Sequence, residues 1–560
     1  MCKVDQVLED VSIGEIDGVC VYDIPLFKYA RLTSCDVERS FAQYKSFRDN
    51  RHAFVMENLE MTFVVHCNSR PTTSTQVWLP PQSPDSWEGI RDATVVGSPC
   101  PQLSLFFDKY DGDEDCLYLN VFTPEVINIA YISYLGTKCE FMSLKEGFLS
   151  LQNEELPGNN GMKDQVQALK WVKQNIDKFG GDPNSITIFG ESSGGSSVHL
   201  HLLSPMSRGL FHRAISQSGS ALNPWAYQTP EESLELALRL GEDFGAISSD
   251  RHIVLERLKQ VPVRQLVEYM GAKLLMPFSG TVCKPTQDTN AASGEIFLPD
   301  SPMNLINKGK FLEVPYMTGV NSEEGIILTK VLRHLSRLLS SVVDVFEVTL
   351  PLFIGQKIPR AREMAQSVQQ RYFTNDSLLL NYINVLTDLL FVNGVYCTAQ
   401  KQTFLSNAPI YVYEFSFDGT ANVLKRMIYD GAALPGACHG DEITYLFRVD
   451  LLPVTIDEGT PEYQTSLRLA RMWANFAKTG NPTPKQDALL NNTKWKPISE
   501  SDFPYLSIDK NLEIKHDLRN NNPVWWKTLF RKYTSGVSPC WPHKSSRKIT
   551  AFKRSVNRLG

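Results

Sequence analysis

The stretch Ser185-Ile-Thr-Ile-Phe-Gly-Glu-Ser-Ser-Gly194 decides the fold. Its first five residues are rich in β-branched side chains and predict a short strand. Gly190-Glu191-Ser192-Ser193-Gly194 then fits the pattern G-x-S-x-G, and Gly195-Ser-Ser-Val-His-Leu200 is a plausible helix start. Strand, sharp turn and helix are the context in which this pattern exposes a reactive serine hydroxyl. We therefore predict that Ser192 is a nucleophile; the alternative is a Gly/Ser-rich helix start without catalysis.

The residues before this stretch indicate an α/β fold. Between Lys163 and Phe179, apolar residues recur every three or four positions, which predicts one helix that Gly180 caps. Helix, short loop, strand and helix in succession are typical of a mostly parallel sheet. Near the N-terminus, Met61-Thr-Phe-Val-Val-His66 is a candidate strand. We find no internal repeat.

Composition excludes several classes of protein. The 560 residues include 56 Lys plus Arg and 62 Asp plus Glu, a net charge of −6, which argues against nucleic acid as a partner. No run of about 18 uncharged apolar residues occurs, so we expect no membrane-spanning helix. The cysteines and histidines show no metal-binding spacing, so we expect no metal and no cofactor.

The sequence constrains the compartment less. The first residues lack the apolar run of a secretory signal, which predicts a cytoplasmic protein as written, or a secreted or endoplasmic-reticulum protein if the N-terminus is incomplete. The 11 cysteines are an odd number, so at least one is unpaired or pairs between chains. Two sequons, Asn375-Asp-Ser and Asn491-Asn-Thr, raise the hypothesis of a glycoprotein.

A serine nucleophile needs a base, and the base needs an orienting carboxylate. In the fold that the G-x-S-x-G context indicates, the chain order is serine, acid, histidine. Composition alone does not choose among the histidines that follow Ser192, which are His199, His201, His212, His252, His334, His439, His516 and His543.

Long co-linear segments carry a family resemblance. They are Trp87–Thr94, Glu114–Asn120, Gly147–Gln152, Leu156–Gln165, Phe179–Ser185, the serine motif, Ala214–Ser220, Gly436–Ile443 and Phe476–Pro482. From about Pro80 to Trp526 the chain resembles the type-B carboxylesterases, the carboxylesterase/cholinesterase family of α/β-hydrolases, in its insect-type branch. The resemblance implies an α/β-hydrolase fold, with a mostly parallel central sheet and helices on both faces. It also implies a serine esterase that acts on small-molecule carboxylic esters.

The resemblance assigns the catalytic partners. Ser192 matches the family's nucleophile, Glu324 in Gly319-Val-Asn-Ser-Glu-Glu-Gly325 matches its acid, and His439 matches its base. Ser193 stands where the family usually has Ala, and its backbone N–H can still donate to an oxyanion. In this order the three side chains form the expected serine–acid–histidine set.

Other matched positions are supporting ones. Trp225 resembles a wall of the substrate pocket, with packing in the core as an equal alternative. Cys100 and Cys116 match a disulfide pair of the family. Glu191, either Ser218 or Ser220, and Glu442 resemble family residues that surround the catalytic ones.

One departure concerns the oxyanion hole. The family carries a His-Gly-Gly-Gly type motif before the nucleophile, and this chain has none: its Gly-Gly pairs are Gly180-Gly181 and Gly194-Gly195. An atypical segment, Thr137–Glu146, stands in that region, so we expect one strand and the oxyanion loop to be lacking. Losing one oxyanion donor costs roughly 100- to 1,000-fold in turnover. We predict very weak or no activity for this polypeptide, either as an active enzyme whose gene model is mis-assembled or as a non-catalytic binding or adhesion relative.

The remaining expectations concern organisation and substrate. We predict an atypical segment over residues 1–75, one esterase domain over 76–540 and a basic, disordered tail over 541–560. The region Leu103–Asp115 contains no Trp, so acetylcholine is not the expected substrate, because a quaternary ammonium favours a Trp-containing cage. A general carboxylic ester is expected instead.

Overall fold

The computed structural model describes most of the chain between residues 98 and 534, together with one short strand before it. The described residues are 62–66, 98–103, 110–122, 147–272, 283–291, 295–329, 341–354, 357–374, 377–429, 434–447 and 454–534. The 1–75 segment beyond residues 62–66, the 541–560 tail, the Thr137–Glu146 segment and the place of the lacking strand lie outside these residues, so those predictions stay untested.

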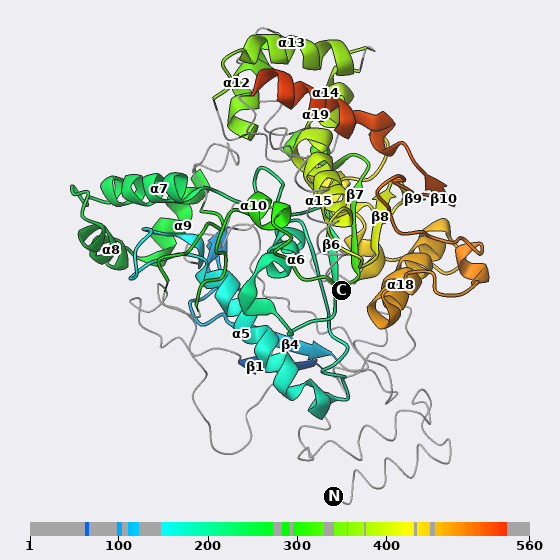
Figure 1. Cartoon of the computed structure of the whole chain (residues 1–560), viewed down its shortest axis with the longest axis horizontal. Helices are drawn as coiled ribbons and strands as arrows, with labels where there is room; N and C mark the ends of the chain where they lie inside the picture. Colours follow the sequence, from blue (N-terminus) through cyan, green and yellow to red (C-terminus); the bar gives the residue numbers. More distant parts are fainter. Residues whose placement is uncertain are drawn as a thin grey trace, which may run out of the picture.

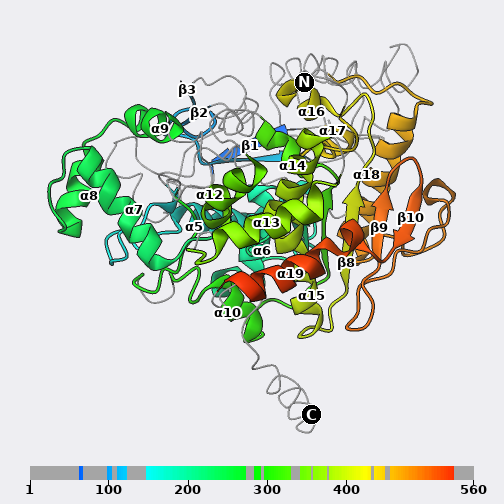
Figure 2. The same ribbon diagram turned by 90° about the horizontal axis from the view of Figure 1, so that it is seen from above.

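A six-stranded sheet runs through the centre of the described molecule. Its order is β10-β9-β8-β7-β6-β5, and all neighbours are parallel except the β9–β10 pair. Figure 2 shows β8, β9 and β10 beside one another. The strands are β5 (Thr187–Glu191), β6 (Arg213–Gln217), β7 (Tyr316–Asn321), β8 (Ile410–Phe415), β9 (Tyr505–Ile508) and β10 (Leu512–Lys515). The predicted mostly parallel α/β sheet is confirmed.

Side chains of β8 alternate between the two faces of the sheet. Ile410 and Val412 pack in one core with helices α5, α6 and α15. Tyr411 and Tyr413 pack in a second core, whose helical partner is α18. Both faces are therefore apolar and covered by helices, as a parallel sheet requires.

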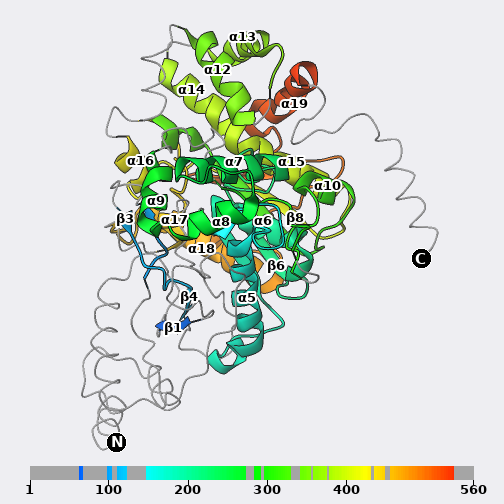
Figure 3. The same ribbon diagram turned by 90° about the vertical axis from the view of Figure 1, so that its left-hand side faces the viewer.

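Helices surround the sheet and gather on its flanks. They are α5 (Asn160–Asn175), α6 (Ser193–Leu203), α7 (Pro230–Asp243), α8 (Arg251–Lys259), α9 (Val263–Ala272), α10 (Pro302–Asn307), α12 (Val342–Ile354), α13 (Ala361–Tyr372), α14 (Leu378–Thr387), α15 (Asn393–Thr403), α16 (Val423–Ile428), α17 (Ile443–Leu446), α18 (Pro461–Thr479) and α19 (Asn522–Tyr533). Figures 1 and 3 show α12, α13, α14 and α19 together at one end.

Shorter elements complete the described chain. They are β1 (Thr62–His66), β2 (Gln102–Leu103), β3 (Tyr110–Asp111), β4 (Tyr118–Phe122), and the turns η2 (Ile176–Phe179), η3 (Pro205–Ser207), η4 (Glu324–Leu328), η5 (Asp388–Val392), η6 (Ala488–Leu490) and η7 (Leu518–Asn521). The candidate strand near residue 61 is β1, which pairs antiparallel with β4. At the opposite end from the helix group, Figure 1 shows β1 and β4 beside α5.

The predicted elements around the serine motif are present with shifted ends. The helix expected over 163–179 is α5 followed by η2, and Gly180 ends it with φ +82°. The strand expected over 185–189 is β5, which begins two residues later, because its register against β6 pairs Thr187 with Arg213. Ser185 instead closes a turn through its N–H, which donates to the Asp182 carbonyl.

One helical stretch, Leu378–Thr403, is long and apolar enough to cross a membrane by length and composition. It comprises α14, η5 and α15. However, 78% of its most apolar window is buried inside the protein, as in the core helix of a globular domain. The stretch therefore gives no clear transmembrane span.

Candidate active site

Ser192 occupies a strained turn between β5 and α6. Its φ of 60° and ψ of −121° are a backbone conformation that residues other than glycine rarely adopt. Its N–H donates to the Gln217 carbonyl at 2.8 Å. Glycine is needed where backbones cross closely here: a Cβ on Gly190 would lie 2.5 Å from the Gly194 carbonyl carbon. A Cβ on Gly219 would lie 2.1 Å from the Ser192 carbonyl oxygen. The strand–turn–helix expected from the motif is therefore present, and we call residues 190–195 the nucleophile turn.

The structure brings Ser192, His439 and Glu324 together from three distant parts of the chain. His439 Nε2 lies 2.7 Å from Ser192 Oγ, and His439 Nδ1 lies 2.6 Å from Glu324 Oε2. Glu324 is the first residue of η4, three residues after the end of β7, and its side chain is fully buried. His439 lies on the irregular segment 434–441, which we call the base loop.

Hydrogen bonds orient the Glu324 carboxylate. Its second oxygen, Oε1, accepts the Asn321 N–H at 2.7 Å, so one oxygen is held by the backbone and the other faces the imidazole. Because Glu324 accepts at Nδ1, the proton is assigned to that nitrogen and Nε2 faces the serine hydroxyl. This is the arrangement that a general base next to a serine requires.

Further carboxylates surround the same imidazole. Glu191 Oε1 lies 3.2 Å from His439 Nε2, at ion-pair distance. Burial alone would lower the pKa of His439, but the charges of Glu191 and Glu324 outweigh it and raise that pKa to about 9. Burial raises the pKa of Glu191 to about 7, although the charge of His439 opposes the shift. Glu191 therefore lies where its charge acts directly on His439.

Glu442 is fully buried, and its charge also raises the pKa of His439. Its two oxygens accept from Gln217 Nε2 at 3.2 Å and from Asn321 Nδ2 at 2.5 Å. The indole N–H of Trp473 donates to Gln217 Oε1 at 3.1 Å and fixes the amide in this orientation. Burial, followed by the charge of Glu191, raises the pKa of Glu442 to about 8.

The two serines left open by the sequence differ in their contacts. Ser218 has φ 52° and is fully buried; its N–H donates to the Gly319 carbonyl, and within the described chain its hydroxyl has no hydrogen-bond partner. Ser220 donates through its hydroxyl to Asn223 Oδ1 at 2.8 Å. Ser218 directly follows Gln217, the last residue of β6, whose carbonyl accepts the Ser192 N–H.

Trp225 is buried and packs with a second aromatic residue that sequence reasoning missed. Its indole N–H donates to the Leu390 carbonyl at 2.8 Å, and its ring lies 6.0 Å from that of Phe391. The Phe391 ring lies 4.6 Å from the His439 imidazole. Phe391 belongs to η5, a π-helical turn inside the α14–α15 helix, and a single π turn leaves no periodic signal in the sequence.

Arg519, in η7, connects the segment that precedes Glu324 with the π-helical turn η5. Its guanidinium donates to the Ser322 carbonyl at 2.6 Å and to Asp388 Oδ1 at 3.0 Å. Ser322 lies two residues before Glu324, and Asp388 begins the turn that carries Phe391. The intervening Glu323 has its pKa raised to about 7 by burial, against the charge of Arg519.

The other predicted residues lie as follows. Ser193 is the first residue of α6, so its N–H belongs to the helix start, where donors lack acceptors within the helix. Cys100 and Cys116 form a disulfide bond, as the resemblance implied. Among the described residues, no group of three or more His, Cys, Asp or Glu side chains could hold a metal ion.

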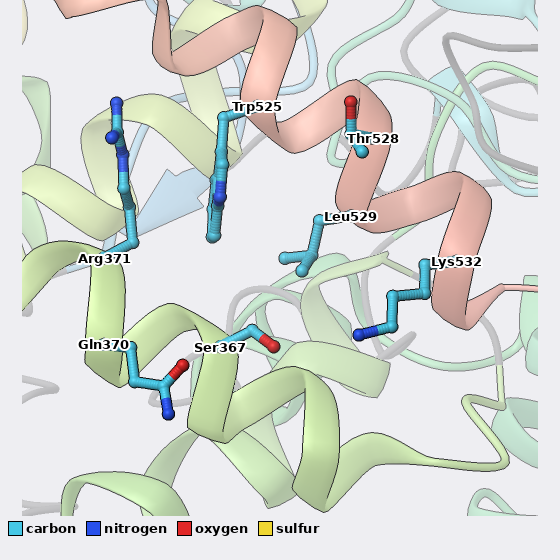
Figure 4. A pocket seen from close by; sticks show the side chains of 7 residues that line it. All are labelled: Ser367, Gln370, Arg371, Trp525, Thr528, Leu529 and Lys532. Atoms are coloured by element: carbon cyan, nitrogen blue, oxygen red, sulfur yellow. The ribbon is translucent and has the colours of Figure 1, made fainter.

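A surface cavity of about 350 Å³ lies elsewhere, between α13 and α19. Figure 4 shows Trp525 and Lys532 of α19 facing Ser367 and Gln370 of α13. None of Ser192, His439 and Glu324 lines it, so its walls belong to a different part of the fold from the candidate site.

Comparison with known proteins identifies the family. The model of the "Carboxylesterase family" matches residues 68–131 and 146–526. The chain belongs to the carboxylesterase family and is by class a carboxylic ester hydrolase. The break in the match falls on residues 132–145, which overlap the atypical Thr137–Glu146 segment.

Individual relatives agree with this assignment. Venom carboxylesterase-6 of Apis mellifera is 30% identical over 497 residues, which cover 80% of this chain and 86% of the relative. Juvenile hormone esterase of Tribolium castaneum is 30% identical over 504 residues, covering 80% and 84%. The crystal structure of juvenile hormone esterase from Manduca sexta, with OTFP covalently attached, superposes with a TM-score of 0.73 at 23% identity, covering 86% of this chain and 97% of that one. The α/β-hydrolase fold is thereby confirmed.

Proposed function

We propose that this chain is a serine esterase that cleaves carboxylic esters through an acyl-enzyme, with Ser192 as nucleophile, His439 as base and Glu324 as acid. The observation that carries the proposal is the continuous hydrogen-bonded chain Ser192 Oγ–His439–Glu324, with heavy-atom distances of 2.7 and 2.6 Å. Such distances are within reach of direct proton transfer.

The proposed reaction has two halves. His439 Nε2 accepts the Ser192 proton while Oγ attacks the ester carbonyl carbon, and the imidazolium then protonates the departing alcohol. Water next attacks the acyl-enzyme with His439 again as base, which releases the acid and restores Ser192. Glu324 holds the Nδ1 proton and stabilises the imidazolium through both halves.

The charge around His439 sets the pH at which this works. The base must be neutral to accept a proton, yet its pKa is raised to about 9 by nearby carboxylates. The proposed reaction therefore accelerates with rising pH up to about that value. The same carboxylates stabilise the imidazolium that forms in the transition state. They therefore lower the fraction of neutral His439 before the reaction, but favour the proton transfer from Ser192 once it begins.

The oxyanion hole limits the proposed activity. The Ser193 N–H supplies one donor at the start of α6. The glycine-rich motif that would supply the others is absent from the sequence. At roughly 100- to 1,000-fold per lost donor, turnover falls far below that of a relative with the whole set.

The substrate class follows from the relatives and from the aromatic wall. Named relatives include juvenile hormone esterase and, at 28% identity, the acylcarnitine hydrolase of Rattus norvegicus. The Phe391 ring lies beside the His439 imidazole and the Trp225 ring packs against Phe391, in a place that suits the apolar part of an ester. We propose a small carboxylic ester with an apolar acyl or alcohol group as substrate.

A fluorophosphonate probe tests the proposal directly. It reacts with an activated serine, so we expect the chain to be labelled at Ser192 and Ser192→Ala to remain unlabelled. A second variant carries residues 123–146 replaced by the matching segment of a relative with the glycine motif. We expect this variant to gain ester turnover. If it neither labels nor turns over, the second candidate, a non-catalytic binding protein suggested by the missing motif, is favoured.

Glycosylation is a further part of the proposal. Asn491 of the Asn-Asn-Thr sequon is exposed at the end of η6, where an oligosaccharide transferase can reach it. The Cys100–Cys116 disulfide fits an oxidising compartment in which such transfer occurs. A mobility shift on glycosidase treatment of secreted protein, lost in Asn491→Gln, tests this; Asn375 lies outside the described residues.

A further inference from the structure

The base loop has no helix or strand to hold it, yet the position of its backbone decides whether His439 reaches Ser192. Gly436 and Gly440, on either side of His439, have φ of +76° and +78°. The segment is therefore shaped by contacts with its neighbours rather than by regular hydrogen bonding.

Neighbours on one side belong to the acid's own segment. Asn321 Nδ2 donates to the Cys438 carbonyl at 2.7 Å, and the Ala437 N–H donates to Ser322 Oγ at 3.0 Å. These bonds connect the end of β7 with the base loop, and so keep the acid and the base at a fixed separation. These bonds reach Ala437 and Cys438 only, so residues 434–436 of the loop need other contacts.

That part of the loop is held by one lysine. Lys425, in α16, is only 8% exposed although its side chain is charged. Its ammonium donates to the carbonyls of Leu434 at 3.0 Å and Gly436 at 2.7 Å, and it also pairs with Asp418. An ammonium has three N–H donors, and these three partners use all of them.

The backbone of the same lysine holds the far end of the base loop. The Lys425 N–H donates to Asp441 Oδ1 at 3.2 Å, while Asp441 Oδ2 accepts the Cys438 N–H at 2.8 Å. Asp441 is fully buried. Lys425 therefore fastens the loop three to five residues before His439 through its side chain and two residues after it through Asp441.

We propose that Lys425 is a positioning residue for His439: its ammonium and backbone N–H hold the base loop so that Nε2 stays within hydrogen-bond distance of Ser192. This inference rests on the proposed function of His439. Lys425 touches neither Ser192 nor the imidazole, so its effect is on geometry. A displacement of about 1 Å in a reacting group can cost roughly 100-fold in rate.

Lys425→Met tests the inference, because it keeps the length and removes all three donors. We expect the rate of fluorophosphonate labelling of Ser192 to fall roughly 10- to 100-fold. Lys425→Arg, which keeps the charge and can reach both carbonyls, is expected to recover most of that rate. Arg426→Met, at the exposed neighbouring position of α16, is the matched control and should label like the unaltered chain. Equal rates for Lys425→Met and the unaltered chain, or an equal loss in Arg426→Met, would overturn the inference.

A readout that needs no activity separates this inference from the proposed function. In protein with ¹⁵N-labelled histidine, the Nδ1 proton between His439 and Glu324 should give a far-downfield resonance that His439→Ala removes. We expect Lys425→Met to shift or broaden it and Arg426→Met to leave it unchanged. If the unaltered chain does not label, the proposed function fails, but an unchanged resonance in Lys425→Met still overturns the positioning role. Should Lys425→Met not fold, Lys425→Gln, which keeps two donors, decides by the same resonance.

Discussion

The nucleophile turn and the base loop reach the same point by different means. The nucleophile turn is held by backbone against backbone, because Gly190 and Gly219 leave no room for a Cβ. The base loop is held mainly by side chains. Lys425 and Asn321 donate to its carbonyls, and its own Asp441 accepts from the Cys438 N–H and the Lys425 N–H. One backbone bond, from the Glu323 N–H to the Ala437 carbonyl, adds to these. The first arrangement depends on local shape, whereas the second depends mostly on buried charged and amide side chains. The turn should therefore be sensitive to added volume, and the loop to lost charge and to pH.

The largest expected effect follows from changing Glu324, the acid that hydrogen-bonds to His439 of the base loop. Glu324→Gln keeps the size of the side chain but removes the charge that stabilises the imidazolium. We expect the labelling rate of Ser192 to fall roughly 1,000- to 10,000-fold, by analogy with triads whose acid becomes an amide. Glu323→Gln, the adjacent buried carboxyl, is the control and should lose far less. A Glu324→Gln variant that keeps more than a tenth of the rate would remove Glu324 from the relay.

Next is the steric test of the nucleophile turn. A methyl group on Gly219 would lie 2.1 Å from the Ser192 carbonyl oxygen, so Gly219→Ala must shift the backbone there. We expect a loss of about 1–3 kcal/mol in the free energy of unfolding, measured by denaturant titration. Gly194→Ala is the matched control, because a Cβ there meets no described atom within 4 Å and the site is helical. Equal losses in both would show that the close approach at Gly219 is not what holds the turn.

A third prediction separates charge from shape within the site. Glu191 lies in the nucleophile turn but acts on the base, since its charge is among the causes that raise the pKa of His439 to about 9. Glu191→Gln removes an anion that favours imidazolium, so the pKa of His439 should fall and the labelling rate should level off at lower pH. The pH dependence of labelling measures this shift. A profile that stays in place would mean that Glu191 does not set the base's protonation.

The last prediction concerns stability as a function of pH. An unfolded glutamate loses its proton near 4.5, whereas folded Glu323 keeps its proton up to a pKa of about 7. Between these values the folded state binds more protons, so the free energy of unfolding falls as pH rises. His439 acts in the same direction between its ordinary 6.5 and its raised pKa of about 9.

The melting temperature should therefore decline from pH 5 to pH 9, and Glu323→Gln should make the decline shallower. Both groups belong to the acid and base side of the site rather than to the nucleophile turn. Thermal unfolding at closely spaced pH values checks this, and a rise over the same range would contradict the protonation states described.

The two regions also differ in how far sequence predicts them. The nucleophile turn is local, so Ser192, the strand before it and the helix after it could be predicted from one continuous stretch, residues 185–200. Both ends of that strand lie two residues later than predicted, because pairing with β6 decides them. The base loop lies far from the nucleophile in the sequence, with His439 247 residues after Ser192, and no local spacing selects that histidine. His439 was identified as the base from the resemblance to the family.

Other features of the site left no signal that reasoning from residues could use. Phe391 lies against the imidazole because one π turn interrupts a helix, and the apolar run around it looks like any buried helix. In the sequence, Lys425 cannot be told from a surface lysine. Only the tertiary fold places the Leu434 and Gly436 carbonyls next to its ammonium. Buried polar contacts of this kind depend on the tertiary fold, which is why they follow from the structure alone.

The central claim is that Ser192, His439 and Glu324 form an assembled relay in a chain whose sequence lacks the glycine-rich motif of the family. The most direct measurement takes one sample, titrates it with a fluorophosphonate and then measures its turnover of a short aryl ester beside a family member that has the glycine motif. We predict labelling of Ser192 that Ser192→Ala abolishes, with turnover at least 100-fold below that of the relative. Absence of labelling would contradict the assembled relay, and turnover within tenfold of the relative would contradict the role given to the missing motif.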